Sequence, residues 1–155
     1  MRDRIAQAIK DAMRSGDKRR LATLRLVMAA IKDRDIAAQM EAGGQGPRRD
    51  KITEAEVLAL LQKMIKQRRE SVAAYHRGGR QDLADQEAQE ITVIEEFLPR
   101  QMDETEMRDA VATVIKDLGC AGLKDMGRVM AALKARHAGQ MDLVKASALA
   151  KELLT

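Results

Sequence analysis

The sequence predicts an all-α protein: an N-terminal multi-helix domain with a long helical hairpin, followed by a small C-terminal three-helix bundle. Leu, Ala, Lys, Arg and Glu dominate its 155 residues, charged residues reach 34% and aromatic residues only 1%. This composition favours helices, because strands draw on β-branched and aromatic residues. Apolar residues recur at helical spacing, and no segment shows the two-residue alternation of a strand.

Two helices are expected before a glycine-rich segment. An apolar stripe over residues 2–14 predicts the first, which Ser15-Gly16 ends. Asp17 is placed to cap the second, over 18–41, whose apolar face consists of Leu21, Leu24, Val27, Met28 and Ile31. The segment 43–47 lacks the Gly-Lys-Ser/Thr ending of a phosphate-binding loop and no strand precedes it, so we interpret it as a linker.

A helical hairpin is expected next. Thr53 and Glu56 have the spacing of a capping box, and the helix that they start runs to about residue 77. A Gly-Gly turn connects it to a second helix over 81–97, which makes the two helices antiparallel neighbours. Arg68 interrupts the apolar stripe of the first helix. We expect it to form an ion pair across the hairpin with Glu87 or Glu90 that sets the register of the two helices.

Leu98-Pro99 marks the predicted domain boundary, which gives domains at 1–98 and 99–155. Three short helices are expected in the second domain, with Asp103, Asp125 and Asp142 placed as their N-terminal caps. On the last helix, the side chains expected to face the core are those of Leu143, Val144, Ala146, Leu149 and Leu153.

The chain has a net charge of +4, and the first 51 residues hold 13 basic against 7 acidic side chains. The densest cluster is Lys18, Arg19, Arg20 and Arg25, with Arg14 nearby, and a second basic group consists of Arg48, Arg49 and Lys51. Cations at the start of a helix oppose its macrodipole, which indicates an anionic partner. The alternative is an ordinary solvated helix face.

Several classes of protein are excluded or disfavoured. A single cysteine rules out an intrachain disulfide and a thiolate zinc cluster, and the two histidines lie far apart in the sequence. The scarcity of aromatic residues disfavours nucleic-acid binding by base stacking. No apolar run has the length of a membrane span, and none resembles a signal peptide. We expect a cytoplasmic protein with no metal, no cofactor and no membrane partner.

Four stretches together resemble the YqeY family over nearly the whole chain. The first stretch is Leu24-Arg25-Leu26 with Ile31-Lys32, and the second is Lys66 to Ser71 with Gly79 to Ala84, Glu87 and Glu90-Ile91. The third is Phe97-Leu98-Pro99-Arg100-Gln101-Met102, and the fourth is Lys124-Asp125-Met126-Gly127-Arg128-Val129-Met130. The sequence departs from the family pattern at Gln140-Met141, where the family tends to place a basic and then a small residue.

The resemblance implies a GatB/YqeY-like accessory protein. Members of this family share a tail domain with the GatB subunit of aminoacyl-tRNA amidotransferase, in which that domain helps to grip tRNA. The family is labelled as carbon–nitrogen ligases with glutamine as amido-N-donor. However, Cys120 and His137, the one pair that could act as nucleophile and base, lie on separate segments with no third orienting group in sight. We therefore expect a non-catalytic protein.

Two binding functions remain open. The first is tRNA binding through phosphate contacts, for which the candidate residues are Lys124, Arg128, Lys134 and Lys145, with Lys18, Arg19 and Arg20 as a second patch. Gly127 would permit close approach of a backbone, or else tight helix packing. The second is a protein-interaction adaptor without RNA binding. Exposure of several of Met13, Met28, Met40 and Met102 in one patch would favour it.

Overall fold

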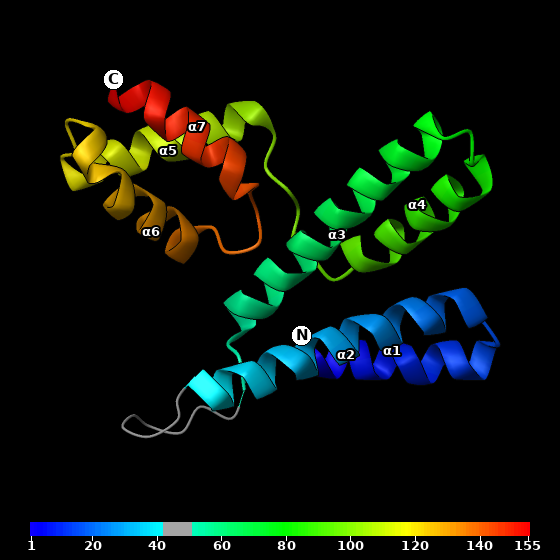
Figure 1. Cartoon of the computed structure of the whole chain (residues 1–155). Coiled ribbons are helices and arrows are strands. Elements are labelled where there is room, and N and C mark those ends of the chain that lie inside the picture. The colour runs from blue at the N-terminus through cyan, green and yellow to red at the C-terminus, as the bar shows by residue number, and fades with distance from the viewer. Residues whose placement is uncertain (42–50) are drawn as a thin grey trace. The chain divides into compact units, whose positions relative to one another are not determined.

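The structure, a computed structural model, describes residues 1–41 and 51–155. The described residues form seven α-helices and one short 3-10 helix with no strand, which confirms the all-α class. They divide into two compact units, Met1–Leu98 and Pro99–Thr155, which we call unit 1 and unit 2 (Figure 1). The predicted linker at 43–47 and the basic pair Arg48 and Arg49 lie outside the described residues.

Unit 1 consists of two helical hairpins. The first joins α1 (Arg2–Ser15) to α2 (Lys18–Glu41) at Gly16, whose φ of 73° lies in the left-handed region that glycine adopts freely. The second joins α3 (Glu54–Arg77) to α4 (Gln81–Glu95), and these two helices lie side by side (Figure 1). Because α2 also packs on α3 and α4, the two hairpins share one core.

The predicted caps and the predicted ion pair of unit 1 are confirmed. The Asp17 carboxylate accepts a hydrogen bond from the backbone N–H of Arg20, and Thr53 and Glu56 form a reciprocal capping box. Arg68 Nε donates to Glu90 Oε2 across the second hairpin at 3.0 Å. Burial, together with the nearby charge of Glu90, raises the pKa of the Glu87 carboxyl beside this pair.

A buried carboxylate that sequence reasoning did not find ties unit 1 together. Asp35 of α2 accepts two hydrogen bonds from the Arg2 guanidinium, at 2.6 and 2.8 Å, and one from the backbone N–H of Ile52 at 2.8 Å. These contacts join the start of α1 to the C-terminal third of α2 and to the segment that leads into α3. The Arg2 hydrogen bonds, as the main cause, lower the pKa of Asp35.

Unit 2 is a three-helix bundle of α5 (Glu104–Leu118), α6 (Met126–Arg136) and α7 (Leu143–Leu154), with the 3-10 helix η1 (Leu123–Asp125) before α6. Each of the three α-helices packs against the other two. Their core is formed by Met107, Val111, Val114, Val129, Leu133, Met141, Ala146, Leu149, Ala150 and Leu154.

Three expectations for unit 2 are corrected. Asp103 and Asp142 cap their helices, but Asp125 makes no side-chain cap at α6, because its carboxylate accepts instead from the backbone N–H of Ala121. Val144 and Leu153 are 64% and 38% exposed rather than turned inward. The inward stripe of α7 instead follows Ala146, Leu149, Ala150 and Leu154, where the alanines allow the neighbouring helices to come close.

The loop before α7 serves the packing of unit 2. Met141 is 2% exposed and belongs to the core. The carbonyl of Gln140 accepts a hydrogen bond from the backbone N–H of Met102 at 2.7 Å, and Gln101 Nε2 donates to the carbonyl of Gly139. The departure from the family pattern at Gln140-Met141 therefore places an apolar side chain in the core.

Candidate functional site

The arginines and the lysines of unit 2 have different surroundings. Each arginine lies within 3.4 Å of a carboxylate, in the pairs Arg100–Glu106, Arg108–Glu152, Arg128–Asp125 and Arg136–Asp117. The lysines are exposed, and none has a carboxylate partner in the described part of the chain; they are Lys116, Lys124, Lys134, Lys145 and Lys151. The lysines are therefore the cations of this unit that form no salt bridge with a described residue, and residues 99–155 hold nine basic and eight acidic side chains in all.

The residues predicted to contact phosphate in unit 2 therefore fall into two groups, unpaired lysines and one paired arginine. Lys124 in η1, Lys134 in α6 and Lys145 in the first turn of α7 are exposed and unpaired among the described residues. Arg128 is held from two sides: its guanidinium donates to Asp125 at 3.4 Å and to the carbonyl of Leu118 at 3.2 Å. Arg128 therefore joins the start of α6 to the end of α5, and a phosphate would have to compete with these contacts.

At the start of α6, the backbone N–H of Met126 donates to the carbonyl of Leu123 in η1. No side chain caps this helix. Its second residue, Gly127, is exposed, and a Cβ added there would meet no atom within 4 Å. Tight helix packing therefore does not explain Gly127, and close approach of a backbone stays a prediction. The hydrogen bond from the Ala121 backbone lowers the pKa of Asp125 and keeps that carboxylate on the loop before the helix.

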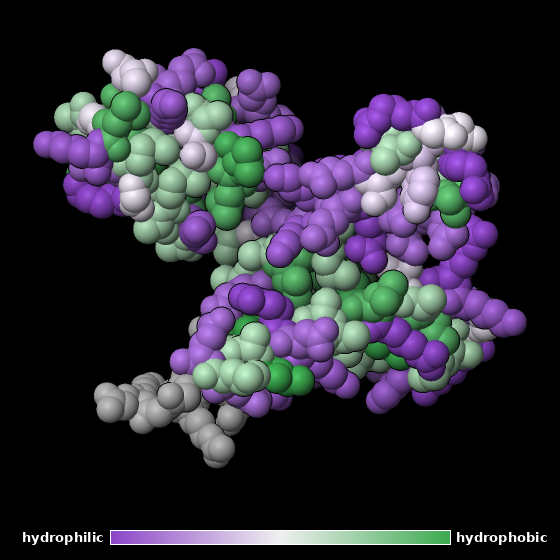
Figure 2. Space-filling model, viewed as in Figure 1, coloured by the Kyte–Doolittle hydropathy of each residue, from purple (hydrophilic) through white to green (hydrophobic). Residues whose placement is uncertain are grey.

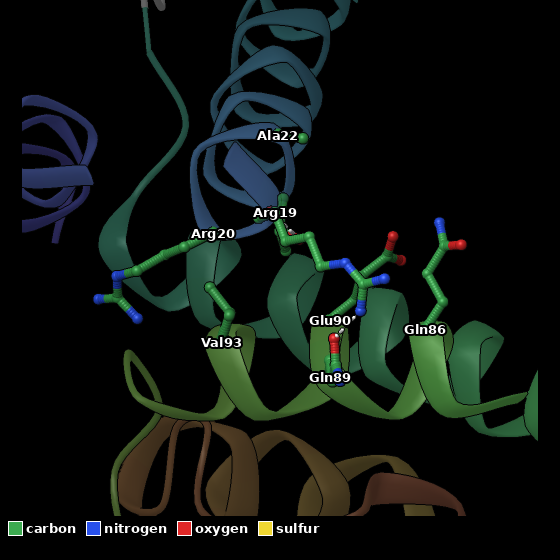
Figure 3. A pocket seen from close by; sticks show the side chains of 8 residues that line it. Arg19, Arg20, Ala22, Gln86, Gln89, Glu90 and Val93 are labelled. Atoms are coloured by element: carbon green, nitrogen blue, oxygen red, sulfur yellow. Dashed lines mark hydrogen bonds between the residues drawn. The ribbon is translucent and has the colours of Figure 1, made fainter. Parts of the chain in front are cut away.

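The second predicted patch borders a small cavity of about 90 Å³ between α2 and α4 (Figure 3). Arg19 extends over α4 and donates to Gln89 Oε1 at 2.5 Å, whereas Arg20 points the other way and pairs with Glu96 at 2.7 Å. Glu90, also in the lining, is already bound to Arg68. Lys18 is exposed and has no charged partner among the described residues. Lys18 and Arg19 thus keep their charge available, while that of Arg20 is neutralised.

Sequence reasoning did not anticipate the contribution of α4 to this cavity. Gln86 and Gln89 line it, and they meet Arg19 only because α2 packs across α4. No local pattern in the sequence marks either glutamine, since each occupies an ordinary exposed position of a helix.

No metal centre is found in the described ranges 1–41 and 51–155. No group of three or more His, Cys, Asp or Glu residues there could hold a metal ion. Cys120 is partly buried and packs beside the core of unit 2. No described helix is long and apolar enough to cross a membrane.

Comparison with known proteins gives matches of two kinds. The family model YqeY, described as Yqey-like protein, matches residues 2–154. Two yeast proteins named "Altered inheritance of mitochondria protein 41, mitochondrial" are also similar. The one from Vanderwaltozyma polyspora is 29% identical over 94 residues, which is 61% of this chain and 46% of the relative. The one from Kluyveromyces lactis is 32% identical over 94 residues, or 60% and 45%. The matched region thus spans less than half the length of these relatives.

Proposed function

Because the chain belongs to the YqeY family, we propose that it is a non-catalytic accessory protein whose unit 2 binds tRNA through the phosphate backbone. The observation that carries the proposal is the division of charge in unit 2, where every arginine is paired, whereas five exposed lysines have no carboxylate partner in residues 1–41 and 51–155. An exposed ammonium group is a compact, strongly hydrated charge that suits phosphate contacts without base readout. The single Tyr and single Phe leave little capacity for base stacking.

The start of α6 is the proposed centre of the interface. Backbone N–H groups at an uncapped helix N-terminus attract a phosphate, and the helix macrodipole adds to that attraction. Gly127 leaves room for the phosphate to approach these N–H groups, and Lys124 lies just before them in η1. We assign Lys134 and Lys145 to neighbouring phosphates, and Arg128 to a supporting contact. Lys18 and Arg19, with Arg20 in a minor role, form the proposed second patch.

Binding of this kind depends on salt, because each phosphate contact releases counterions from the nucleic acid. The test measures binding of total bacterial tRNA to the full chain over a range of salt concentrations. We expect a variant with Lys124→Ala, Lys134→Ala and Lys145→Ala to bind more weakly, with a salt slope reduced by about two to three. The matched control removes three exposed cations of α3 in unit 1, by Lys63→Ala, Lys66→Ala and Arg77→Ala.

An equal loss of affinity in both triple variants would mean that net charge alone causes binding, and would refute a site in unit 2. Absence of tRNA binding at low salt would refute the RNA function altogether. Lys18→Ala with Arg19→Ala tests the second patch in the same assay, and Cys120→Ala is expected to leave binding unchanged.

The adaptor alternative receives no support from the four methionines whose exposure would favour it. Met28 packs against the core of unit 1 and Met102 against the core of unit 2, so that only Met13 and Met40 are strongly exposed. The cytoplasmic location stays a prediction, and both yeast relatives are named as mitochondrial proteins.

A further inference from the structure

The second helix of unit 1 has an apolar face that the core does not use. The core side of α2 is formed by Leu24, Val27, Ile31 and Ala38, all buried. Roughly opposite them lies a row of exposed residues, which we call the outer stripe: Ala22, Leu26, Ala29, Asp33, Ile36 and Met40. Leu26, Ile36 and Met40 are 52%, 54% and 76% exposed. Figure 2 shows apolar and hydrophilic residues side by side on the face of unit 1 along which α2 runs.

The outer stripe has the spacing of a coiled-coil seam. Its members follow one another at intervals of four, three, four, three and four residues. Alternation of four and three places residues at the a and d positions of a heptad repeat, which is the seam that one helix presents to another. A helix face that serves only to contact water has no reason to keep this repeat over more than two heptads.

One border of the outer stripe carries positive charge. Lys18, Arg25 and Lys32 follow each other at seven-residue spacing and occupy the g position on one border. All three are exposed and lack a carboxylate partner in the described ranges; Arg25 donates only to Met13 Sδ, at 3.7 Å. On the other border, the e positions hold Ala30 and Ala37. Charges at e and g positions select the partner of a coiled coil, and here they select an acidic one.

A second copy of this chain fits the outer stripe poorly. In an antiparallel pair, g positions face g positions, which would place Lys18, Arg25 and Lys32 against the same three cations of the other copy. In a parallel pair, a positions face a positions, which would place Asp33 against Asp33. Like charges at such close range destabilise either arrangement.

A membrane surface and RNA also fit the outer stripe less well. A lipid-facing stripe would bury the Asp33 carboxylate among acyl chains, and interfacial helices draw on aromatic residues that α2 lacks. Phosphates would account for Arg25 and Lys32, but not for the exposed apolar side chains of Leu26 and Ile36 beside them.

We infer that the outer stripe of α2 docks an amphipathic helix of a partner protein, which carries acidic residues beside its own apolar seam. The apolar members of the stripe supply the contact area. Lys18, Arg25 and Lys32 pair with the acidic border of the partner, and Asp33 fixes the register through a polar or basic residue opposite it. This surface belongs to unit 1; it shares Lys18 with the second patch proposed to contact RNA and contains none of the lysines of unit 2.

The test uses the full chain and a synthetic helix of several heptads, with Leu at a and d and Glu at e and g. A peptide of the same composition in scrambled order and a twin with Lys in place of Glu are the controls. We expect the acidic heptad helix to bind and both controls to bind at least about tenfold more weakly, as loss of seam or charge complementarity requires. Equal binding of the scrambled peptide would overturn the inference, as would no binding of the acidic helix.

Variants then assign the binding to the outer stripe. Leu26→Asp with Ile36→Asp is expected to weaken binding about tenfold or more. Leu123→Asp with Val144→Asp, two exposed apolar residues of unit 2, is expected to leave it unchanged. Arg25→Glu with Lys32→Glu is expected to reverse the preference, so that the lysine twin binds better than the acidic helix. All these side chains are exposed, and circular dichroism checks that helix content is kept.

Two further outcomes would overturn the inference in favour of another occupant. One is concentration-dependent dimerisation in sedimentation that Leu26→Asp with Ile36→Asp abolishes, which would identify a second copy. The other is loss, in the same variant, of binding to vesicles of phosphatidylglycerol and phosphatidylcholine, which would identify a membrane surface. tRNA binding is expected to be unaffected by this variant.

Discussion

Replacement of Asp35 is expected to be among the most destabilising single changes at a polar residue of unit 1. Its carboxylate accepts three hydrogen bonds, two from Arg2 and one from the backbone N–H of Ile52. Asp35→Ala removes all three hydrogen bonds, leaves the Ile52 N–H without its partner and removes the countercharge of Arg2. Asp35→Asn keeps a side chain of the same size that can still accept from Ile52, but it loses the charge.

The magnitude follows from burial and charge. A hydrogen bond to a charged group contributes about 1.5–3 kcal/mol, and an unsatisfied buried group adds a desolvation cost. The Asp35 side chain is 12% exposed and that of Arg2 is 27% exposed, so that water restores part of the loss for the guanidinium. We therefore expect Asp35→Ala to lower the free energy of unfolding by about 3 kcal/mol, and Asp35→Asn by about half as much.

Urea denaturation followed by far-UV circular dichroism measures this loss, and a double-mutant cycle with Arg2→Met isolates the pair. The control is Asp82→Ala, which breaks the exposed pair between Arg80 and Asp82 and is expected to leave the midpoint nearly unchanged. If Asp35→Ala were no more destabilising than Asp82→Ala, or if the cycle gave no coupling with Arg2, the reasoning would be wrong.

The same pair predicts a dependence on pH. Because the pKa of Asp35 is lowered in the folded state, its stabilisation is complete above the pKa of the unfolded chain. It is lost as the pH falls through the lower, folded pKa. Asp35→Asn removes this contribution, so the difference in stability between wild type and variant should shrink in acid.

Three further predictions concern the hairpin of unit 1 and the helix starts of unit 2. Glu87→Gln is expected to stabilise the chain at neutral pH, because burial raises the pKa of Glu87. The gain in the free energy of unfolding should fade as the pH falls below the ordinary pKa range of Glu, and a gain that persists in acid would contradict this cause. Gly127→Ala should raise the free energy of unfolding by about 0.5–1 kcal/mol, since its Cβ meets nothing, while it weakens tRNA binding. Asp142→Ala should cost about 1 kcal/mol in denaturation experiments, because its carboxylate caps α7 through the N–H groups of Val144 and Lys145.

Sequence reasoning located the candidate site only in part. Lys124, Lys134 and Lys145 could be chosen from charge and resemblance, and the structure leaves them exposed. The contacts of Arg128 could not be foreseen, because its second partner, the carbonyl of Leu118, is set by how α5 meets α6. The signal for the outer stripe of α2, a regular alternation of four and three, is present in the sequence. It becomes evident only once the structure shows which face of α2 the core occupies.

Local interactions explain what the sequence by itself determined. The helix periods and the helix caps involve residues close together in the chain; the caps are Asp17, Thr53, Asp103 and Asp142. The pair between Arg68 and Glu90 joins two helices whose register is fixed by a short turn. The pairing of Asp35 with Arg2, 33 residues away, and the side of α7 that turns inward were decided only by the tertiary structure. In both cases, several partners or faces satisfy the local pattern equally well, and only the packing of distant helices selects one of them.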